Sequence, residues 1–325
     1  MVTIYDIAKE ANVSPATVSR VLNRQGNVRD DTAKRVLRVA KARKYSPNAM
    51  ARSLRTKKSF LIGLIIPDIE NPVYPAPVRG IQDVANQKDY SVIIHSTDGN
   101  ERKEIETIRR LTAAGVDGLI INISESCALL GEEIRRLRQG SLPIVALGPW
   151  HADLEIDCVS VDNQQGAYLA TEHLLKLGHR KIAIVLGPKE NLSSRERFRG
   201  YKKAMDDSCV QVLPDLIQEG NFKMGSGYKA AQKLLAGEEK PDAIFCVNDV
   251  MALGAVKAIQ EGGLRIPEDL AVIGFDDIEL AALPNRPSPA WRSQNTKLAR
   301  SRRNFSFNRS KVPCPLADTI PSNQI

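Results

Sequence analysis

Two short amphipathic segments lie close together in TIYDIAKEANVSPATVSRVLN, which spans residues 3–23. Thr3, with Asp6 three residues later, has the spacing of a capping box at the start of the first segment. Ser14 followed by Pro15 is typical of a helix start, because serine caps a helix and proline suits its first turn. Apolar residues recur at helical spacing in both segments. The pattern predicts a helix-turn-helix.

The second segment leaves a polar face outward, on which Arg20 is the one long hydrogen-bond donor. A helix-turn-helix places its second helix in the major groove of DNA, where arginine reads guanine bidentately and short donors suit phosphates. A third helix over about residues 31–43 would complete the core. The alternative is a small helical hairpin with solvated charges. The outward residues of the second segment are Pro15, Ala16, Thr17, Ser19, Arg20 and Asn23.

Charge divides the chain into three parts. Residues 1–58 contain 14 lysines and arginines and 4 acids, a net charge of +10, whereas the whole chain carries +8. Residues 286–325 are at +7, which leaves residues 59–285 at −9. The first part has the electrostatics of a phosphate-binding module, and the acidic middle part would repel nucleic acid.

A basic segment, YSPNAMARSLRTKKS at residues 45–59, connects the first part to the rest. Leu54 lies among its basic residues with little core to join. An apolar residue in a basic helix suits a wedge between base steps in the minor groove. A basic interdomain linker, with Leu54 packed on a neighbour, fits the residues equally well.

Together, TIYDIAKEANVSPATVSRVLN and YSPNAMARSLRTKKS resemble the LacI/GalR family of bacterial transcription regulators. The resemblance implies a helix-turn-helix domain over residues 1–45 and a hinge helix over residues 46–59 that forms in a dimer. It implies that Pro15, Ala16 and Arg20 take the base-reading positions, the first two through apolar contact alone, and that Leu54 opens the minor groove. The full set of expected DNA contacts is Thr3, Tyr5, Pro15, Ala16, Thr17, Ser19, Arg20, Asn23, Asn48, Ala51, Leu54 and Arg55.

Short apolar runs alternate with helical patterns through residues 60–285. Alternation at this spacing predicts an α/β body with parallel sheets and helices on both faces. A break near residues 148–162 separates a first lobe, about residues 60–150, from a second, about residues 160–285. Two such lobes, which resemble the periplasmic-binding-protein-like body of the family, leave a cleft at the carboxyl ends of the strands for a small ligand.

Polar residues follow several of the predicted strands. Each, taken singly, is more often a helix cap or a loop residue. The resemblance implies that Arg197, Asn248 and Asp276 bind hydroxyls of a sugar or similar polar effector, and an aromatic side chain suits an apolar ring face. The expected effector contacts are Tyr74, Ser124, Trp150, Asp162, Arg197, Asn248 and Asp276. Two prolines in VYPAP, residues 73–77, leave the start of the following helix uncertain.

The sequence indicates no enzyme active site, no metal site and no cofactor site. No glycine-rich nucleotide loop occurs, the five cysteines lack CxxC spacing, and the four histidines have neither metal spacing nor an evident nucleophile partner. The longest apolar stretch, residues 60–66, is too short to span a bilayer. The start MVTIYD lacks a secretory leader, so we expect a protein of the bacterial cytosol, associated with the nucleoid.

Residues 286–325 depart from the family pattern, because they are basic and lack a sustained apolar period. Codon degeneracy allows the frame one base earlier to encode LTSVAQSKHEIGKKSAEFLL over residues 288–307, which resembles the segment expected there. We therefore hypothesise a one-base frame slip near residues 286–288. It predicts a first-lobe sheet with an open edge and an uncovered apolar face, poor stability and weak dimerisation. A native basic extension is the alternative.

These observations predict a sequence-specific DNA-binding repressor controlled by a small polar effector such as a sugar. Its partners would be a pseudo-palindromic double-stranded operator, the effector and a second copy of the chain, without a membrane. One alternative is a nonfunctional truncated regulator. Another is a free-standing ligand-binding protein, against which the basic first part argues.

Overall fold

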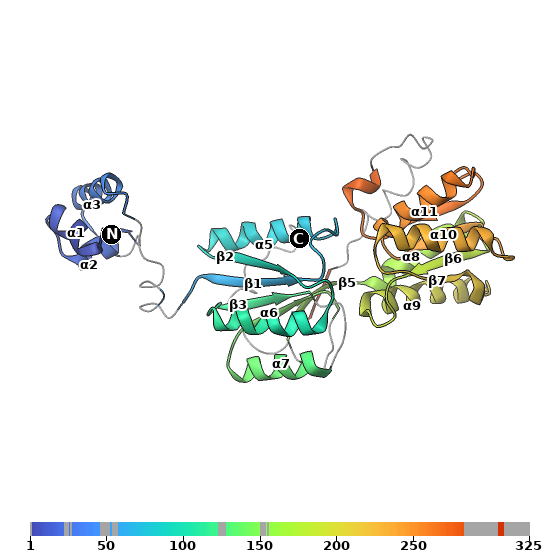
Figure 1. The fold of residues 1–325 in the computed structure, drawn as a ribbon, viewed down its shortest axis with the longest axis horizontal. Helices are drawn as coiled ribbons and strands as arrows, with labels where there is room; N and C mark the ends of the chain where they lie inside the picture. The colour runs from blue at the N-terminus through green and yellow to red at the C-terminus, as the bar shows by residue number, and fades with distance from the viewer. Residues whose placement is uncertain are drawn as a thin grey trace. The chain divides into compact units, whose positions relative to one another are not determined.

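A computed structural model describes most of the chain, in two compact units that meet between Phe60 and Leu61. The first unit is a small helical bundle, and the second contains two β-sheets (Figure 1). The residues that the structure describes are 2–22, 26, 28–45, 53, 58–122, 128–149, 154, 156–282 and 305–308.

The first unit contains the predicted helix-turn-helix as α1 (Ile4–Glu10) and α2 (Pro15–Leu22). The capping box is confirmed, since the Asp6 backbone N–H donates to Thr3 Oγ1 at 3.3 Å and the Thr3 N–H donates to the Asp6 carboxylate at 2.8 Å. Ser14 Oγ likewise accepts from the Thr17 N–H at 3.2 Å.

The third helix is also confirmed as α3 (Asp30–Ala42). It packs against both earlier helices around a small apolar core. Its Val36 and Ala40 are buried, while Val39 is only half-buried. The other fully buried members of this core are Ile7, Ala8, Ala11, Val18 and Val21.

The first lobe is built on a six-stranded sheet in the order β10-β5-β4-β3-β1-β2. Helix α5 lies on one face, and α6 and α7 lie on the other (Figure 1). Strands β1 to β5 are parallel, as predicted. The strands are β1 (Leu61–Ile66), β2 (Ser91–Ser96), β3 (Gly118–Ile121), β4 (Ile144–Leu147), β5 (Asp157–Val161) and β10 (Phe305–Asn308). The helices are α5 (Pro75–Gln87), α6 (Glu101–Ala113) and α7 (Ala128–Gln139).

The prolines of VYPAP do not disrupt α5. Tyr74 is the N-cap, so Pro75 and Pro77 fall in the first turn, where a backbone N–H has no partner within the helix. The first helical hydrogen bond runs from the Val78 N–H to the Tyr74 carbonyl at 3.0 Å. The helix therefore begins at Pro75, within the VYPAP segment that left its start uncertain.

The expected open edge of the first-lobe sheet is wrong. Strand β10 pairs antiparallel with β5, with Phe305 opposite Val161 and Asn308 opposite Cys158. The pairing was not evident from sequence, because four residues in a basic segment carry little strand pattern. The basic tail therefore contributes a strand to the sheet, although it lacks the family pattern.

The second lobe contains a four-stranded parallel sheet in the order β7-β6-β8-β9. Helix α8 packs against α9, and α10 against α11. Strand β7 (Ile217–Glu219) is short, and sequence analysis missed it. The remaining elements are α8 (Asn163–Lys176), β6 (Ile182–Leu186), α9 (Leu192–Asp207), a 3-10 turn at Pro214–Leu216, α10 (Met224–Ala236), β8 (Ala243–Cys246), α11 (Asp249–Glu261), β9 (Ala271–Ile273) and a 3-10 turn at Glu279–Ala282.

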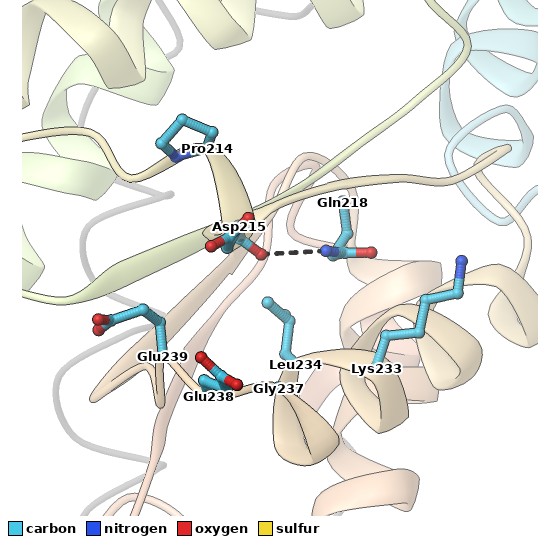
Figure 2. Close-up of a pocket in the computed structure, with 8 residues that line it drawn as sticks. All are labelled: Pro214, Asp215, Gln218, Lys233, Leu234, Gly237, Glu238 and Glu239. Carbon is cyan, nitrogen blue, oxygen red and sulfur yellow. Dashed lines mark hydrogen bonds between the residues drawn. The ribbon is translucent and has the colours of Figure 1, made fainter.

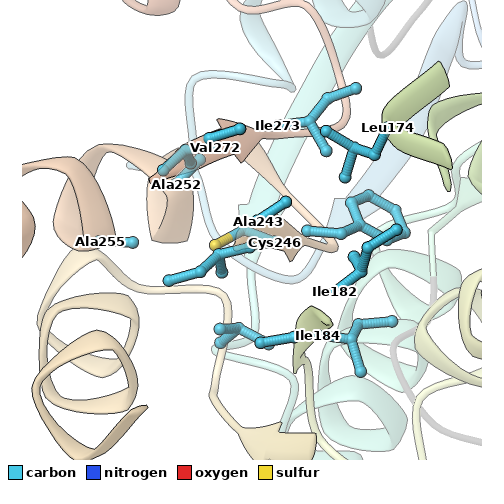
Figure 3. Packing of buried hydrophobic residues seen from close by; sticks show 14 of the residues in the cluster. Leu174, Ile182, Ile184, Ala243, Cys246, Ala252, Ala255, Val272 and Ile273 are labelled. Atoms are coloured by element: carbon cyan, nitrogen blue, oxygen red, sulfur yellow. The ribbon is translucent and has the colours of Figure 1, made fainter. Parts of the chain in front are cut away.

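One continuous apolar cluster fills this second lobe. Figure 3 shows Ile182 and Ile184 of β6 close to Ala243 and Cys246 of β8, with Val272 of β9 beside them. All five side chains are buried. Such a core holds the carboxyl ends of β6, β8 and β9 at fixed positions, and the polar residues described below follow those ends.

Candidate ligand cleft and DNA-facing surface

A buried arginine lies at the centre of the candidate cleft. Arg197, from α9, donates through Nε to Asn163 Oδ1 at 2.8 Å and through Nη1 to the Val247 carbonyl. Its guanidinium carbon lies 3.8 Å from the centroid of the Phe275 ring. A carboxylate oxygen of Asp276 is 3.3 Å from Nη1. These contacts fix the guanidinium plane, as a preorganised binding group requires.

Two carboxyl groups accompany this arginine. Burial raises the pKa of Asp276 to about 6, although the Arg197 charge opposes the shift. Burial, and then the Asp276 charge, raise the pKa of Asp249 to about 7. Near neutral pH the site therefore holds an ionised Asp276 beside Arg197 and an Asp249 that is partly protonated.

The backbone around Asp276 is shaped to bring these groups together. Asp276 has φ of 101°, a left-handed conformation that side chains rarely adopt. Asp249 Oδ2 accepts from the Ile278 N–H at 2.9 Å and anchors this loop to α11. A Cβ on Gly274 would lie 2.1 Å from Asp249 Oδ1, so only glycine fits there.

Two of the expected effector residues also cap helices. Asp162 accepts from the Gln165 N–H at 2.8 Å at the start of α8. Asn248 Oδ1 accepts from the Met251 N–H at 3.0 Å at the start of α11, and its Nδ2 donates to the Phe222 carbonyl at 3.0 Å. The capping role that residue statistics favour is thus realised, and any ligand contact would come in addition to it.

Groups of the first lobe face this site. The Tyr74 hydroxyl donates to Asn122 Oδ1 at 3.4 Å. Burial raises the pKa of Tyr74, the Asp276 charge raises it further and the Arg197 charge opposes both, so this phenol lies within the electric field of the second-lobe pair. Ser124 and Trp150, the other two expected effector contacts, lie outside the described residues.

A charged contact also links the two lobes. Lys223, which precedes α10, lies 3.9 Å from a carboxylate oxygen of Asp68 in the first lobe. Asp98, also of the first lobe, interacts with the charge of Lys223 as well. The lobes therefore approach each other through oppositely charged groups at this contact.

Sequence analysis did not assign several groups that the structure brings to the cleft. Asn163 and Asp249 stand in the pairs Asp162-Asn163 and Asn248-Asp249, whose first members alone were assigned. Phe275 and Phe222 carry no pattern of their own, and they are recognised by their contacts in the fold: Phe275 with Arg197, and Phe222 through the hydrogen bond of its carbonyl with Asn248. Pairing across 34 residues, as between Asn163 and Arg197, leaves no local signal.

The first unit exposes the surface expected to face DNA. Arg20 and Ala16 are exposed on α2, and the Tyr5 side chain is 71% exposed on α1. Thr3 is exposed as well, although its hydroxyl takes part in the capping box. Pro15, Thr17 and Ser19 are half-buried. Asn23, Asn48, Ala51, Leu54 and Arg55 lie outside the described residues.

Two family profiles match this architecture. The profile described as "Periplasmic binding proteins and sugar binding domain of LacI family" matches residues 59–290. The profile described as "Bacterial regulatory proteins, lacI family" matches residues 3–48. The chain belongs to the LacI family. It is therefore a transcriptional regulator with a helix-turn-helix unit and a two-lobed α/β body.

Relatives in the LacI family align along most of the chain. Catabolite control protein A of Priestia megaterium is 39% identical over 286 residues, which cover 87% of this chain and 84% of that protein. A structure of the lac repressor dimer bound to operator and the anti-inducer ONPF is 29% identical, with a TM-score of 0.77, and covers 92% of this chain and 90% of that chain.

A ribose complex is also similar to the body. The LacI-family regulator from Enterococcus faecium, crystallised with bound ribose, is 30% identical with a TM-score of 0.62. The match covers 74% of this chain and 88% of that chain.

A hollow of this LacI-family chain lies in the second lobe and includes none of the residues of the Arg197 site. It has a volume of about 400 Å³ and lies where β7 begins and α10 ends. Figure 2 shows Asp215, Gln218, Lys233 and the glutamates 238 and 239 around it, with Gln218 donating to the Asp215 carbonyl at 3.2 Å. It is open and carries three carboxylates, so it lacks the apolar walls and convergent donors of a ligand site.

The described helices hold no segment that is both long enough and apolar enough to cross a membrane. In the described part of the chain, no group of three or more potential metal ligands is close enough to hold an ion.

Proposed function

We propose that this regulator is a repressor that binds an operator through α2. A small polar ligand in the cleft controls its affinity for the operator. The observation that carries the proposal is the joining of two elements in one chain. One is a capped helix-turn-helix with Arg20 exposed, and the other is a buried guanidinium held by Asn163, which begins α8, and by Asp276, which follows β9.

For the DNA side, Arg20 would read a guanine in the major groove, because its side chain is exposed on α2 and arginine is the usual bidentate partner of guanine. Ala16 would add only apolar contact, for example with a thymine methyl. Pro15, which likewise has no side-chain donor, would also add only apolar contact. The remaining proposed contacts are to phosphates or come from residues outside the described ones: Thr3, Tyr5, Thr17, Ser19, Asn23, Asn48, Ala51, Leu54 and Arg55.

For the effector side, Arg197 and Asp276 would bind neighbouring hydroxyls, one as donor and the other as acceptor. Tyr74 would contribute from the first lobe, so that a bound ligand bridges both lobes. The remaining proposed contacts are Ser124, Trp150, Asp162 and Asn248. The LacI-family sugar-binding description and the bound ribose of the Enterococcus faecium regulator support a sugar as the ligand class.

We also propose a homodimer bound to a pseudo-palindromic site, as in the operator complex of the lac repressor dimer. If a frame slip produced the basic tail, residues 286–325, we expect dimerisation to be weak. Sequencing the gene across codons 280–310 tests the slip, which is rejected if no codon set spells LTSVAQSKHEIGKKSAEFLL. Size-exclusion chromatography tests the dimer directly.

The decisive experiment is footprinting of the full chain on the DNA upstream of its own gene, followed by selection from a randomised operator library. Arg20→Ala should relax the preference at one base pair by about 1–3 kcal/mol. Arg38→Ala, an exposed arginine on α3, is the matched control and should leave the preference intact. An unchanged preference in Arg20→Ala contradicts the base-reading assignment.

A further inference from the structure

We propose that Glu196 is a positioning residue of the cleft, which holds the Asn163 amide in the orientation that keeps the Arg197 guanidinium in place. This role requires no contact between Glu196 and a ligand. The inference rests on the proposed function, because it concerns the arginine of the same site. The arrangement itself is measurable without ligand or DNA.

The Asn163 side chain connects two residues that do not face each other. Glu196 and Arg197 are adjacent on α9, and neighbouring residues of a helix point in different directions. Asn163, at the start of α8, reaches both: its Nδ2 donates to Glu196 Oε2 at 3.0 Å, and its Oδ1 accepts from Arg197 Nε at 2.8 Å. Asn163 is only 1% exposed, so these protein groups take the place of water as its partners.

The partners of this amide decide its orientation. An asparagine amide has a donor end and an acceptor end, whereas a guanidinium only donates and an ionised carboxylate only accepts. The reversed amide would set its NH2 group against Arg197 Nε and its oxygen against Glu196, which leaves buried polar groups unpaired. The amide also donates to the Val161 carbonyl, but at 3.4 Å, so Glu196 is the stronger constraint.

The charge of Glu196 strengthens this constraint. Burial raises the pKa of Glu196, and the hydrogen bond from Asn163 opposes that rise. The hydrogen bond therefore favours the ionised carboxylate, which accepts more strongly than a neutral group. The charges of Arg199 and Arg197 favour the ionised form as well.

The contact with Asn163 completes the anchoring of the guanidinium. The Phe275 ring fixes its plane from one face, and Nη1 is held by the Val247 carbonyl and Asp276. With Nη1 alone held, the group can still rotate within that plane. The second anchor, from Nε to Asn163, removes this rotation.

This hydrogen-bond relay also lies where the two lobes join. Strand β5 of the first-lobe sheet ends at Val161, and α8 of the second lobe begins at Asn163. The Asn163 amide contacts Val161 on one side of this crossover and residues of α9 on the other. The orientation of the cleft arginine is thus tied to the junction of the lobes.

The experiment is NMR of the full chain with isotope-labelled arginine, which measures how fast the Arg197 Nε–H proton exchanges with solvent. Arg197→Lys identifies its resonance. Glu196→Leu should speed this exchange by about tenfold or more, because the amide is no longer held. Glu196→Gln retains an acceptor for Asn163 and should stay within about twofold of the unchanged protein. Glu172→Leu on α8, whose carboxylate pairs with Lys176, is the matched control and should leave the exchange unchanged.

A double substitution tests whether Glu196 acts through Asn163. Asn163→Ala should speed the exchange of the Arg197 proton, and Glu196→Leu added to Asn163→Ala should speed it no further. Fully additive effects of the two substitutions contradict the relay. Glu196→Ala, which introduces no new bulk, takes the place of Glu196→Leu if that variant does not fold.

Unchanged exchange in the Glu196→Leu or Glu196→Ala protein overturns the inference, and so does an equal acceleration in Glu196→Gln. None of these measurements involves operator or effector. A chain that shows the predicted exchange but protects no operator contradicts the proposed function and leaves the relay standing. A chain that protects its operator but shows unchanged exchange contradicts the relay alone.

Discussion

The two lobes of the body share strand–helix alternation but differ in how completely their sheets are covered. In the second lobe, every residue of β8 and β9 is buried, as are the first four of β6, whereas the edge strand β7 has no buried residue. In the first lobe, β1 is buried from Ile62 onward, but its neighbours β3 and β4 alternate between buried and half-buried residues, and the edge strand β2 has no buried residue. Sheets buried on both faces read as continuous apolar runs, whereas alternation indicates one better-covered face.

The difference in burial follows from which helices lie on each face of the first-lobe sheet. Residues of β3 and β4 that face α6 and α7, such as Ile144 and Ala146, are buried. Val145 and Leu147, on the opposite face, are half-buried, and α5 is the one helix among the described residues that lies there. Strands β8 and β9 of the second lobe are therefore more completely covered than β3 and β4 of the first, and the second lobe supplies the Arg197 cluster.

The largest predicted difference in the free energy of unfolding is between two isoleucine-to-alanine substitutions, one in a central strand of each lobe. Ile244→Ala in β8 removes a fully buried side chain and should lower the free energy of unfolding by about 2–5 kcal/mol. Ile120→Ala in β3 should cost only about 1 kcal/mol, because that side chain is half-buried. Urea denaturation followed by circular dichroism measures both losses. Equal losses would mean that the first-lobe sheet is as well covered as the second.

Replacement of two helical glycines by alanine should change the stability of the protein in opposite directions. A Cβ on Gly254 of α11 would lie 2.0 Å from the Met224 carbonyl oxygen of α10, so Gly254→Ala should destabilise by about 1–3 kcal/mol. Gly80 of α5 has no neighbouring atom within 4 Å of such a Cβ, so Gly80→Ala should stabilise by about 0.5–1 kcal/mol. Thermal unfolding of both variants measures the two signs. If Gly254→Ala is neutral, the close approach of α10 and α11 is incorrect.

The lobes should also respond oppositely to pH. Asp249 and Asp276 have folded pKa values of about 7 and about 6, above their ordinary value of 3.8, so the folded state holds extra protons. The stability that these two carboxyl groups contribute is therefore greatest at low pH and is lost as the pH rises through about 6 and about 7. Glu133, between Arg136 and Arg109, has its pKa lowered chiefly by its hydrogen bond with Arg136. The stability that Glu133 contributes is therefore present above about pH 4.5 and is lost as the pH falls through its folded pKa.

Thermal unfolding at about pH 3, about pH 5 and about pH 8 measures these slopes, because the lowered pKa of Glu133 places its change below about pH 4.5. Asp249→Asn should raise stability at about pH 8 relative to about pH 5. Glu133→Gln should reduce stability equally at about pH 5 and about pH 8, and by less at about pH 3. An unchanged slope in Asp249→Asn would show that Asp249 is not held in a buried acidic site.

The smallest expected effect is that of the contact between the lobes. Lys223 and Asp68 are partly exposed and 3.9 Å apart, so Lys223→Met should cost less than about 1 kcal/mol in stability. The effect should shrink at high salt, because exposed charges are screened. The charge-reversed pair Lys223→Asp with Asp68→Lys should restore what either single reversal loses. Failure of that rescue would exclude a direct interaction of the two side chains.

Sequence predicted the parts of this molecule that depend on neighbouring residues. Thr3 with Asp6 and Ser14 before Pro15 form caps within four residues, and the apolar runs of β1 and β6 identify their strands directly. Long-range features could not be predicted in this way. Strand β10 depends on pairing with β5 across more than 140 residues, and Asp249 becomes a site residue only through the loop at Ile278.

The central claim is that a small polar ligand at the Arg197 site controls DNA binding. It is tested by fluorescence anisotropy of labelled operator with the full chain, titrated with and without a sugar that binds. The account predicts that the sugar changes operator affinity by roughly fivefold or more, which is typical of coupled sites, and that Arg197→Ala abolishes the change while operator binding persists. An operator affinity that is identical with and without bound sugar would contradict it.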